Sequence, residues 1–193
     1  LDDAYDKGRL MGTFAEDCAE TFQLTREAQD NYALASLSRA LEAQASGAFA
    51  DAVTSVSIGG RYGDRSVTSG AHEGWTVVAE DEQPAKARPE KIPPLKPAFR
   101  KDGTVTAANS SSISDGAAAL VMARESVAKN KGLPIRARIM GHASHAQEPG
   151  LFTTAPVPAA EKLLARLGWS KEDVDLWEVN EAFAVVPMAF MHK

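Results

Sequence analysis

The residue with the clearest chemical potential is Asn180, which follows a strand-like run at residues 175–178 and precedes a helical pattern. One interpretation is an N-cap, because an asparagine amide can bond the free N–H groups at the start of a helix. The other is an amide that faces a cleft at the carboxyl end of a strand, where open α/β sheets bind ligands. The residue type and its position leave both interpretations open.

A second cluster with chemical potential is the run of small and hydroxyl residues at 107–112, which leads into a further small-residue run at 114–119. Small side chains let a ligand approach the backbone, and serine hydroxyls can bond amides or phosphates. The alternative is a serine-rich turn that only caps a helix.

A third feature is a strip of basic residues on an acidic chain. The net charge is −5, which argues against general nucleic-acid binding, and the composition is that of an ordinary globular protein. Between residues 86 and 101 there are nevertheless six basic residues against Glu90 alone. Such a strip suits a compact polyanion such as a nucleotide phosphate, although a solvated loop would look the same. Five prolines between Pro84 and Pro97 predict that it is extended and free of helix.

Cysteine and histidine are less informative. Cys18 is the only cysteine, so no internal disulfide forms. It shares a helix face with Phe14 and Phe22, which predicts a buried, protonated and inert thiol. His142 and His145 are three apart, but no cysteine or carboxylate cluster completes a zinc set, and His72 and His192 are isolated. We therefore expect no metal site.

Alternating elements should position these residues. Their order predicts an α/β core with a mostly parallel or mixed sheet. We expect helices at 14–22 (capped by Thr13), 25–46 (capped by Thr25 and closed by Gly47), 125–131 (stopped by Gly132) and 158–167 (ended by Gly168). Strands are expected at 51–58, 75–79, 136–143 and 175–178, with a loop or hairpin over 61–74 and a capping box at 170–173.

Two motifs together resemble the thiolase family: Val-Asn-Glu-Ala-Phe-Ala at 179–184 and Gly-Thr-Val-Thr-Ala-Ala-Asn-Ser-Ser at 103–111. The resemblance covers residues 4–190 and implies part of the layered αβαβα thiolase core with an inserted α+β loop domain. It assigns residues 1–112 to the loop domain that covers coenzyme A, 113–133 to the end of the N-terminal core half and 134–193 to the start of the C-terminal half. It also favours a buried strand at 117–122.

The resemblance implies roles for individual residues. Asn180 would hold a water that helps to stabilise the thioester oxygen, and the remaining positions would bind the coenzyme or the acyl group. Ala182 and Phe183 would line the pantetheine channel, Ala108 and Ser111 would contact the pantetheine arm, Lys86, Arg88 and Lys91 would meet the adenine and phosphates, and Met11 and Phe152 would border the acyl pocket. Leu10 departs from the usual histidine of this family. A monovalent cation near residues 107–108 and Tyr5 is left open, because Ser110 replaces a common alanine.

The implied activity is that of an acetyl-CoA C-acetyltransferase, which condenses two acetyl-CoA molecules to acetoacetyl-CoA or catalyses the reverse thiolysis. The nucleophilic cysteine, the Gly-His-Pro histidine and the Cys-x-Gly-Gly-Gly cysteine of the family are absent from the 193 residues, so we expect an internal piece that is inactive alone. The coenzyme A thioester would be the substrate, with no covalent cofactor, nucleic acid or membrane as partner. We expect a homo-oligomer, dimer or tetramer, in the cytoplasm, with an organellar location left open because the chain does not begin with Met.

Two rival hypotheses come from other classes. One is a non-catalytic acyl-CoA or lipid carrier that retained the pocket and lost the cysteines. The other is a condensing enzyme of the ketoacyl synthase type, which we disfavour because its members lack the loop domain.

Overall fold

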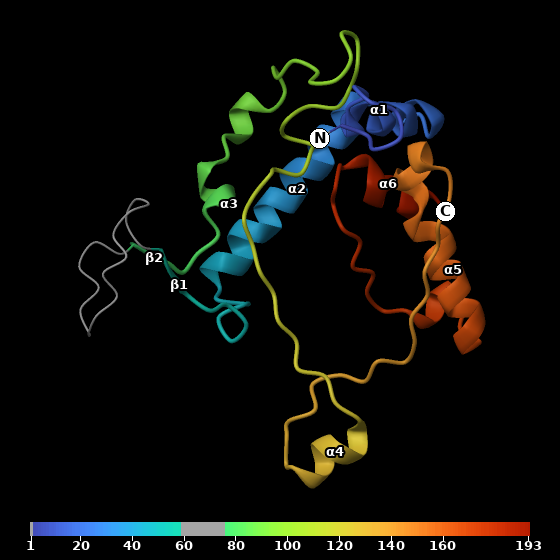
Figure 1. Cartoon of the computed structure of the whole chain (residues 1–193). Helices are drawn as coiled ribbons and strands as arrows, with labels where there is room; N and C mark the ends of the chain where they lie inside the picture. The colour runs from blue at the N-terminus through green and yellow to red at the C-terminus, as the bar shows by residue number, and fades with distance from the viewer. Residues whose placement is uncertain (1, 59–75) are drawn as a thin grey trace.

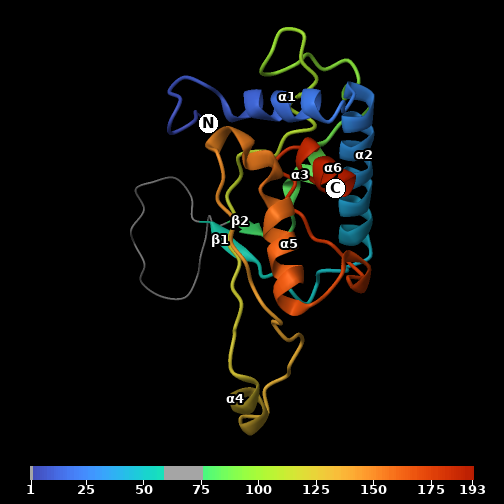
Figure 2. The ribbon, with the colours of Figure 1, turned by 90° about the vertical axis from the view of Figure 1, so that its right-hand side faces the viewer.

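The computed structural model describes residues 2–58 and 76–193 (Figure 1). The first part of the chain forms two long helices, a small sheet and two short helical turns. The second part alternates short helices with extended segments. In both views α4 lies apart from the other helices, at the end of two extended segments (Figures 1 and 2). The elements are α1 (Met11–Thr21), α2 (Arg26–Ala45), β1 (Val56–Ile58), β2 (Thr76–Val78), α3 (Glu82–Lys86), the 3₁₀ helix η1 (Pro89–Lys91), α4 (Glu125–Asn130), η2 (Pro149–Thr154), α5 (Pro156–Leu167), η3 (Lys171–Asp173) and α6 (Val185–His192).

The first two helices begin differently. Helix α2 begins as predicted, because the Thr25 hydroxyl accepts a hydrogen bond of 3.1 Å from the Ala28 amide. Helix α1 starts at Met11 and its N-cap is Leu10, which provides no side-chain bond. The prediction that Thr13 caps α1 was wrong, since its hydroxyl instead donates to the Leu10 carbonyl from inside the first turn, at 2.8 Å.

The predicted hairpin is present but shorter than expected. Strands β1 and β2 pair antiparallel, with Val56 opposite Val78. Residues 51 and 52 belong to a turn rather than to a strand, because the Ala52 and Val53 amides both donate to the Phe49 carbonyl. The loop predicted at 61–74 and the first residue of the second predicted strand, Trp75, lie outside the described residues.

The proline-rich stretch contains helix, contrary to expectation. In α3 the Asp81 carboxylate accepts from the Gln83 amide at 2.9 Å, and Pro84 lies in the first turn, where no N–H is needed. Pro89 occupies the first position of η1 for the same reason. In the first turn, proline is therefore compatible with both short helices rather than preventing them.

The C-terminal helices agree with their sequence signals. Helix α5 begins at Pro156, two residues before the predicted start, and ends at Gly168, whose φ of 67° is left-handed. The predicted capping box closes on η3, with Ser170 and Asp173 bonded reciprocally. Helix α4 is followed by Gly132 at a φ of 63°, as expected for its stop.

Three predicted strands are extended segments that have no strand partner within the described ranges. These are 117–122, 136–143 and 175–178. The prediction that 117–122 is buried was wrong for this chain, since Leu120 is 85% and Val121 97% exposed. A strand is defined by hydrogen bonds to a neighbour, which a pattern of apolar residues cannot supply by itself. The described part of the chain accordingly holds one sheet, and it is antiparallel with two strands.

The buried core lies where α1 meets α6 and residues 103–106, the segment before the serine-rich loop of residues 107–112. Its fully or nearly buried members are Ala15, Cys18, Ala19, Val105, Val185 and Ala189. Figure 2 shows α6 below α1, with α5 running downward next to α6. Cys18 is 5% exposed, so its predicted burial is confirmed, and that burial raises the pKa of its thiol. None of the described helices combines the length and the apolar character that crossing a membrane requires.

Candidate functional site

The serine-rich loop and the segment that contains Asn180 lie side by side, although they are about seventy residues apart in the sequence. An isolated antiparallel bridge pairs Ser110 with Phe183. The Ser111 amide donates to the Ala182 carbonyl at 2.9 Å, and the Ala184 amide donates to the Asn109 carbonyl at 2.9 Å. Backbone bonds therefore fix the register between the two motifs.

A cavity of about 320 Å³ opens between these motifs and helix α2. It brings together three of the predicted site residues, Asn180, Ser111 and Ala108. The N-cap interpretation of Asn180 was wrong, because α6 begins at Val185 and its N-cap is Ala184. The cavity is lined by Tyr32, Ala33, Ser36, Ala108, Asn109, Ser110, Ser111, Ser112, Asn180, Glu181 and Ala184.

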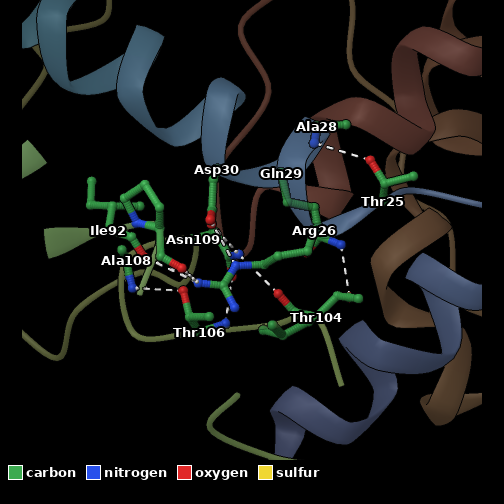
Figure 3. Close-up of polar contacts among 12 residues, drawn as sticks. Thr25, Arg26, Ala28, Gln29, Asp30, Ile92, Thr104, Thr106, Ala108 and Asn109 are labelled. Atoms are coloured by element: carbon green, nitrogen blue, oxygen red, sulfur yellow. Dashed lines mark hydrogen bonds and ion pairs between the residues drawn. The ribbon is translucent and has the colours of Figure 1, made fainter. Parts of the chain in front are cut away.

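The serine-rich loop takes its shape from the buried amide of Asn109, which is 3% exposed. Its Oδ1 accepts from the Thr106 amide at 2.7 Å. Its Nδ2 donates to the Thr104 carbonyl at 3.2 Å and to Oδ1 of Asp30 at 3.3 Å. Asp30 belongs to α2 and forms an ion pair of 2.7 Å with Arg26, as Figure 3 shows. The loop is thus fastened to α2 by side chains rather than by a strand ladder.

A second buried acceptor fastens the segment before this loop to α1. Glu16 is 3% exposed, and its carboxylate accepts from the Thr104 amide at 2.8 Å and from the Val105 amide at 3.0 Å. A Cβ at position 103 would collide with this carboxylate, which explains why Gly103 stands there. The loop and the segment before it therefore depend on carboxylates that α2 and α1 supply.

Helix α2 also holds the residue next to Asn180. The Tyr32 hydroxyl donates to Oε1 of Glu181 at 2.8 Å, and the Ser36 hydroxyl donates to Oε2 at 2.7 Å. Burial, together with the bond to Glu181, raises the pKa of Tyr32 to about 12. The phenol therefore stays protonated and able to donate at neutral pH.

Sequence reasoning missed Tyr32, Ser36, Glu181, Asp30 and Glu16 as parts of this site. The only available signal was that Tyr32 and Ser36 are four apart on one predicted helix, so they share a face. Nothing in the sequence told which distant residue that face would meet.

Other predicted site residues lie away from this cavity. Phe183 packs edge to face on Phe99, with ring centroids 6.1 Å apart. Phe152 packs edge to face on Phe14 at 6.3 Å, and Met11 begins the same helix, α1. Ala182 joins the serine-rich loop through its carbonyl.

The predicted basic residues also lie outside the cavity lining. Lys86 forms an ion pair of 2.9 Å with Glu82 on α3. Arg88 and Lys91 are exposed beside η1. Their side chains are accessible to a solute anion, but they do not converge on Asn180.

A larger and more apolar hollow lies between α5 and α6. Its volume is about 610 Å³, and Trp177 and Phe190 meet in it with ring centroids 5.2 Å apart. It contains none of the predicted site residues. No cluster of three or more potential metal ligands occurs in residues 2–58 and 76–193. His145 bonds to Gln147 and Lys162 instead, and His72 lies outside the described residues.

Solved structures share this fold over the whole chain. An acetyl-CoA acetyltransferase from Bacillus anthracis matches with a TM-score of 0.89 and 41% identity, and this chain covers 46% of it. The Acat5 thiolase from Ascaris suum, solved in complex with coenzyme A, matches with a TM-score of 0.86 and 39% identity, again with 46% of that chain covered. The fold class is that of thiolase-like α/β proteins, as expected from the resemblance.

Sequence comparisons agree with the structural ones. The family model for the thiolase N-terminal domain matches residues 1–126, and that for the thiolase C-terminal domain matches 133–193. The chain belongs to the thiolase family. It is 47% identical over 189 residues to a probable acetyl-CoA acetyltransferase of Dictyostelium discoideum and 46% identical over 180 residues to acetyl-CoA acetyltransferase 2 of Arabidopsis thaliana. These matches cover 98% and 93% of this chain, but only 43% and 42% of the two relatives.

Proposed function

We propose that the whole protein is an acetyl-CoA C-acetyltransferase, which condenses two acetyl-CoA molecules to acetoacetyl-CoA or cleaves a 3-ketoacyl-CoA with coenzyme A. The observation that carries this proposal is the shared cavity of Asn180, Ser111 and Ala108. The names of three of the four relatives, which are acetyl-CoA acetyltransferases, support the same reaction.

In this proposal Asn180 is an electrostatic helper rather than a nucleophile. Attack on a thioester carbonyl places negative charge on its oxygen, and a fixed N–H donor or a water held by it lowers the energy of that state. The nucleophile would be a cysteine outside this sequence. Cys18 does not qualify, because it is buried and its pKa is raised.

The coenzyme A thioester would be bound by the surrounding residues. Ser111, Ala108, Ala182 and Phe183 would line the path of the pantetheine arm, and the acyl group would lie toward Met11 and Phe152. Lys86, Arg88 and Lys91 would attract the phosphates from the exposed strip, with a salt-sensitive contribution.

The domain assignment accompanies this proposal. Residues 1–112 would form the loop domain over the coenzyme, 113–133 would end the N-terminal core half, and 134–193 would begin the C-terminal half. The exposed apolar side chains of the extended segments support it, because strands of a sheet covered on both faces are rich in such residues. They are Ile113, Leu120, Val121, Met122, Ile135, Ile139 and Met140. We further propose a cytoplasmic homo-oligomer, dimer or tetramer, that serves fatty acid metabolism.

Substitution of Asn180 tests the proposed role. In the whole protein, Asn180→Ala should lower kcat for thiolysis of acetoacetyl-CoA roughly 100-fold to 1000-fold, as loss of an oxyanion donor does. The matched control is Asn130→Ala, because Asn130 is exposed on α4 and lies outside the cavity lining. Equal rates for Asn180→Ala and the unmodified protein would refute the role. A whole protein that binds coenzyme A without any thiolysis would favour the carrier.

A further inference from the structure

Glu181 is held at both of its carboxylate oxygens by one helix. Tyr32 and Ser36 are four residues apart on α2, so their side chains rise from the same face. Each hydroxyl donates to a different oxygen, at 2.8 Å and 2.7 Å. Hydrogen bonds to an ionised carboxylate are shorter and stronger than neutral ones. Two of them fix both the position and the rotation of the carboxylate plane.

The same helix holds the opposite wall of the cavity. Asp30, two residues before Tyr32, accepts from the Asn109 amide that shapes the serine-rich loop. Gln29 donates to the Thr104 hydroxyl at 2.9 Å. Helix α2 therefore contacts both walls of the cavity. Gln29 and Asp30 bind the loop that contains Ser111 and the segment before it, and Tyr32 and Ser36 bind Glu181, the residue after Asn180.

The bonds to Glu181 contribute little to stability. Glu181 is exposed, and hydrogen bonds made by exposed groups compete with water. Hydrogen bonds of this kind, which fix a side chain without adding much to stability, can hold a neighbouring site residue in place. Asn180, one peptide bond away, is the residue whose placement it would control.

We propose that Glu181, gripped by Tyr32 and Ser36, is a positioning residue that sets the orientation of Asn180 in the cavity. This inference rests on the proposed thiolase function. Backbone bonds at Ala182 and Ala184 fix the segment on one side of Asn180, and the Glu181 side chain fixes its tilt toward α2.

The test combines Tyr32→Phe with Ser36→Ala in the whole protein, since both changes remove only a hydroxyl. We expect kcat for thiolysis to fall about tenfold to a hundredfold, as a displacement near 1 Å can cause. KM for coenzyme A and the thermal midpoint should change little. Ser38→Ala is the matched control, because Ser38 is exposed on the same helix and is absent from the cavity lining. Glu181→Gln, which still offers an acceptor and a donor, should retain more activity than Glu181→Ala.

A double-mutant comparison separates positioning from a merely structural effect. If Glu181 acts through Asn180, the Tyr32→Phe and Ser36→Ala pair should cost nothing further in an Asn180→Ala background. If the pair lowers kcat as much in the Asn180→Ala background as in the unmodified protein, the inference is overturned. It is also overturned if the pair destabilises the fold enough to account for the fall in kcat.

A readout without activity distinguishes failure of the inference from failure of the proposed function. In nitrogen-labelled protein the side-chain amide resonance of Asn180 should move or broaden in the Tyr32→Phe and Ser36→Ala variant and stay in place in Ser38→Ala. An unmoved resonance contradicts the positioning role whatever the reaction is. If the unmodified whole protein shows no thiolysis but the Asn180 resonance moves in the variant, the proposed function is refuted and the positioning role of Glu181 stands.

Discussion

Asn109 shows how one buried amide can shape a loop that has almost no regular structure. It replaces a strand ladder with three hydrogen bonds, to the Thr106 amide, the Thr104 carbonyl and the Asp30 carboxylate. Because these partners are buried or half-buried, none of them can easily form a replacement hydrogen bond with water when the amide is lost. The position of Ser111 depends on this residue more than on any contact of its own side chain.

Asn109→Ala should therefore destabilise the chain. We expect the free energy of unfolding to fall by about 1 to 3 kcal/mol, the usual cost of leaving buried polar groups unpaired. Urea unfolding followed by circular dichroism measures it. Asn130→Ala makes the same chemical change at an exposed site and should stay within about 0.5 kcal/mol of the unmodified chain. Equal midpoints for the two variants would show that the loop is held by other contacts.

The Tyr32 phenol makes stability depend on alkaline pH. Its pKa is raised from 10.0 to about 12 in the folded chain, so between these values the folded state retains a proton that the unfolded state releases. The free energy of unfolding is therefore unaffected by this ionisation below pH 10.0 and falls as the pH rises through about 12. Tyr32→Phe should flatten the fall of the unfolding midpoint over this window. Parallel curves for the two proteins would contradict it.

At this scale the sequence predicted part of the site. Asn180 and Ser111 were expected in one site because both belong to the motifs that resemble the thiolase family, and both residues line the cavity. Glu16, Asp30 and Glu181 could not be predicted, because a carboxylate on a helix is most often solvated and only its distant partner identifies its role.

Among the elements, helices followed their local signals closely. Thr25 caps α2, Gly168 ends α5, and the Ser170 capping box closes. These signals succeed because each is completed by residues within one turn. Strands were predicted poorly at 117–122 and 136–143, since the neighbour that completes a strand can be anywhere in the sequence or outside it.

The end of α5 gives a direct test of local coding. Gly168 has a φ of 67°, where a Cβ costs about 1 to 2 kcal/mol, partly offset by the lower entropy of the unfolded alanine chain. Gly168→Ala should lower the free energy of unfolding by about 1 kcal/mol in thermal or urea unfolding. At Gly116 an added Cβ would meet no atom within 4 Å, and that substitution should be neutral within about 0.5 kcal/mol. A Gly168→Ala variant as stable as Gly116→Ala would mean that α5 ends for another reason.

In the whole molecule, helix α2 connects the parts of the candidate site. It contacts the serine-rich loop through Asp30, the Asn180 segment through Tyr32 and Ser36, and α3 through the bond of Gln44 to the Asp81 carbonyl (Figure 1). The extended segment after α4 contacts other elements, through the ion pair of Arg138 with Glu125 on α4 and the bond of Arg166 on α5 to the His142 carbonyl. The cavity therefore depends on α2, on the serine-rich loop and on the residues just before α6.

Mapping of coenzyme A onto the chain tests the central claim most directly. Amide resonances of nitrogen-labelled protein should shift during titration at residues 110–112 and 180–181, which line the polar cavity. Ser111→Ala should weaken binding several-fold through the loss of one hydrogen bond, whereas Ser38→Ala should not. Shifts confined to the apolar hollow around Trp177 and Phe190, or an unchanged spectrum at saturating coenzyme, would contradict the account.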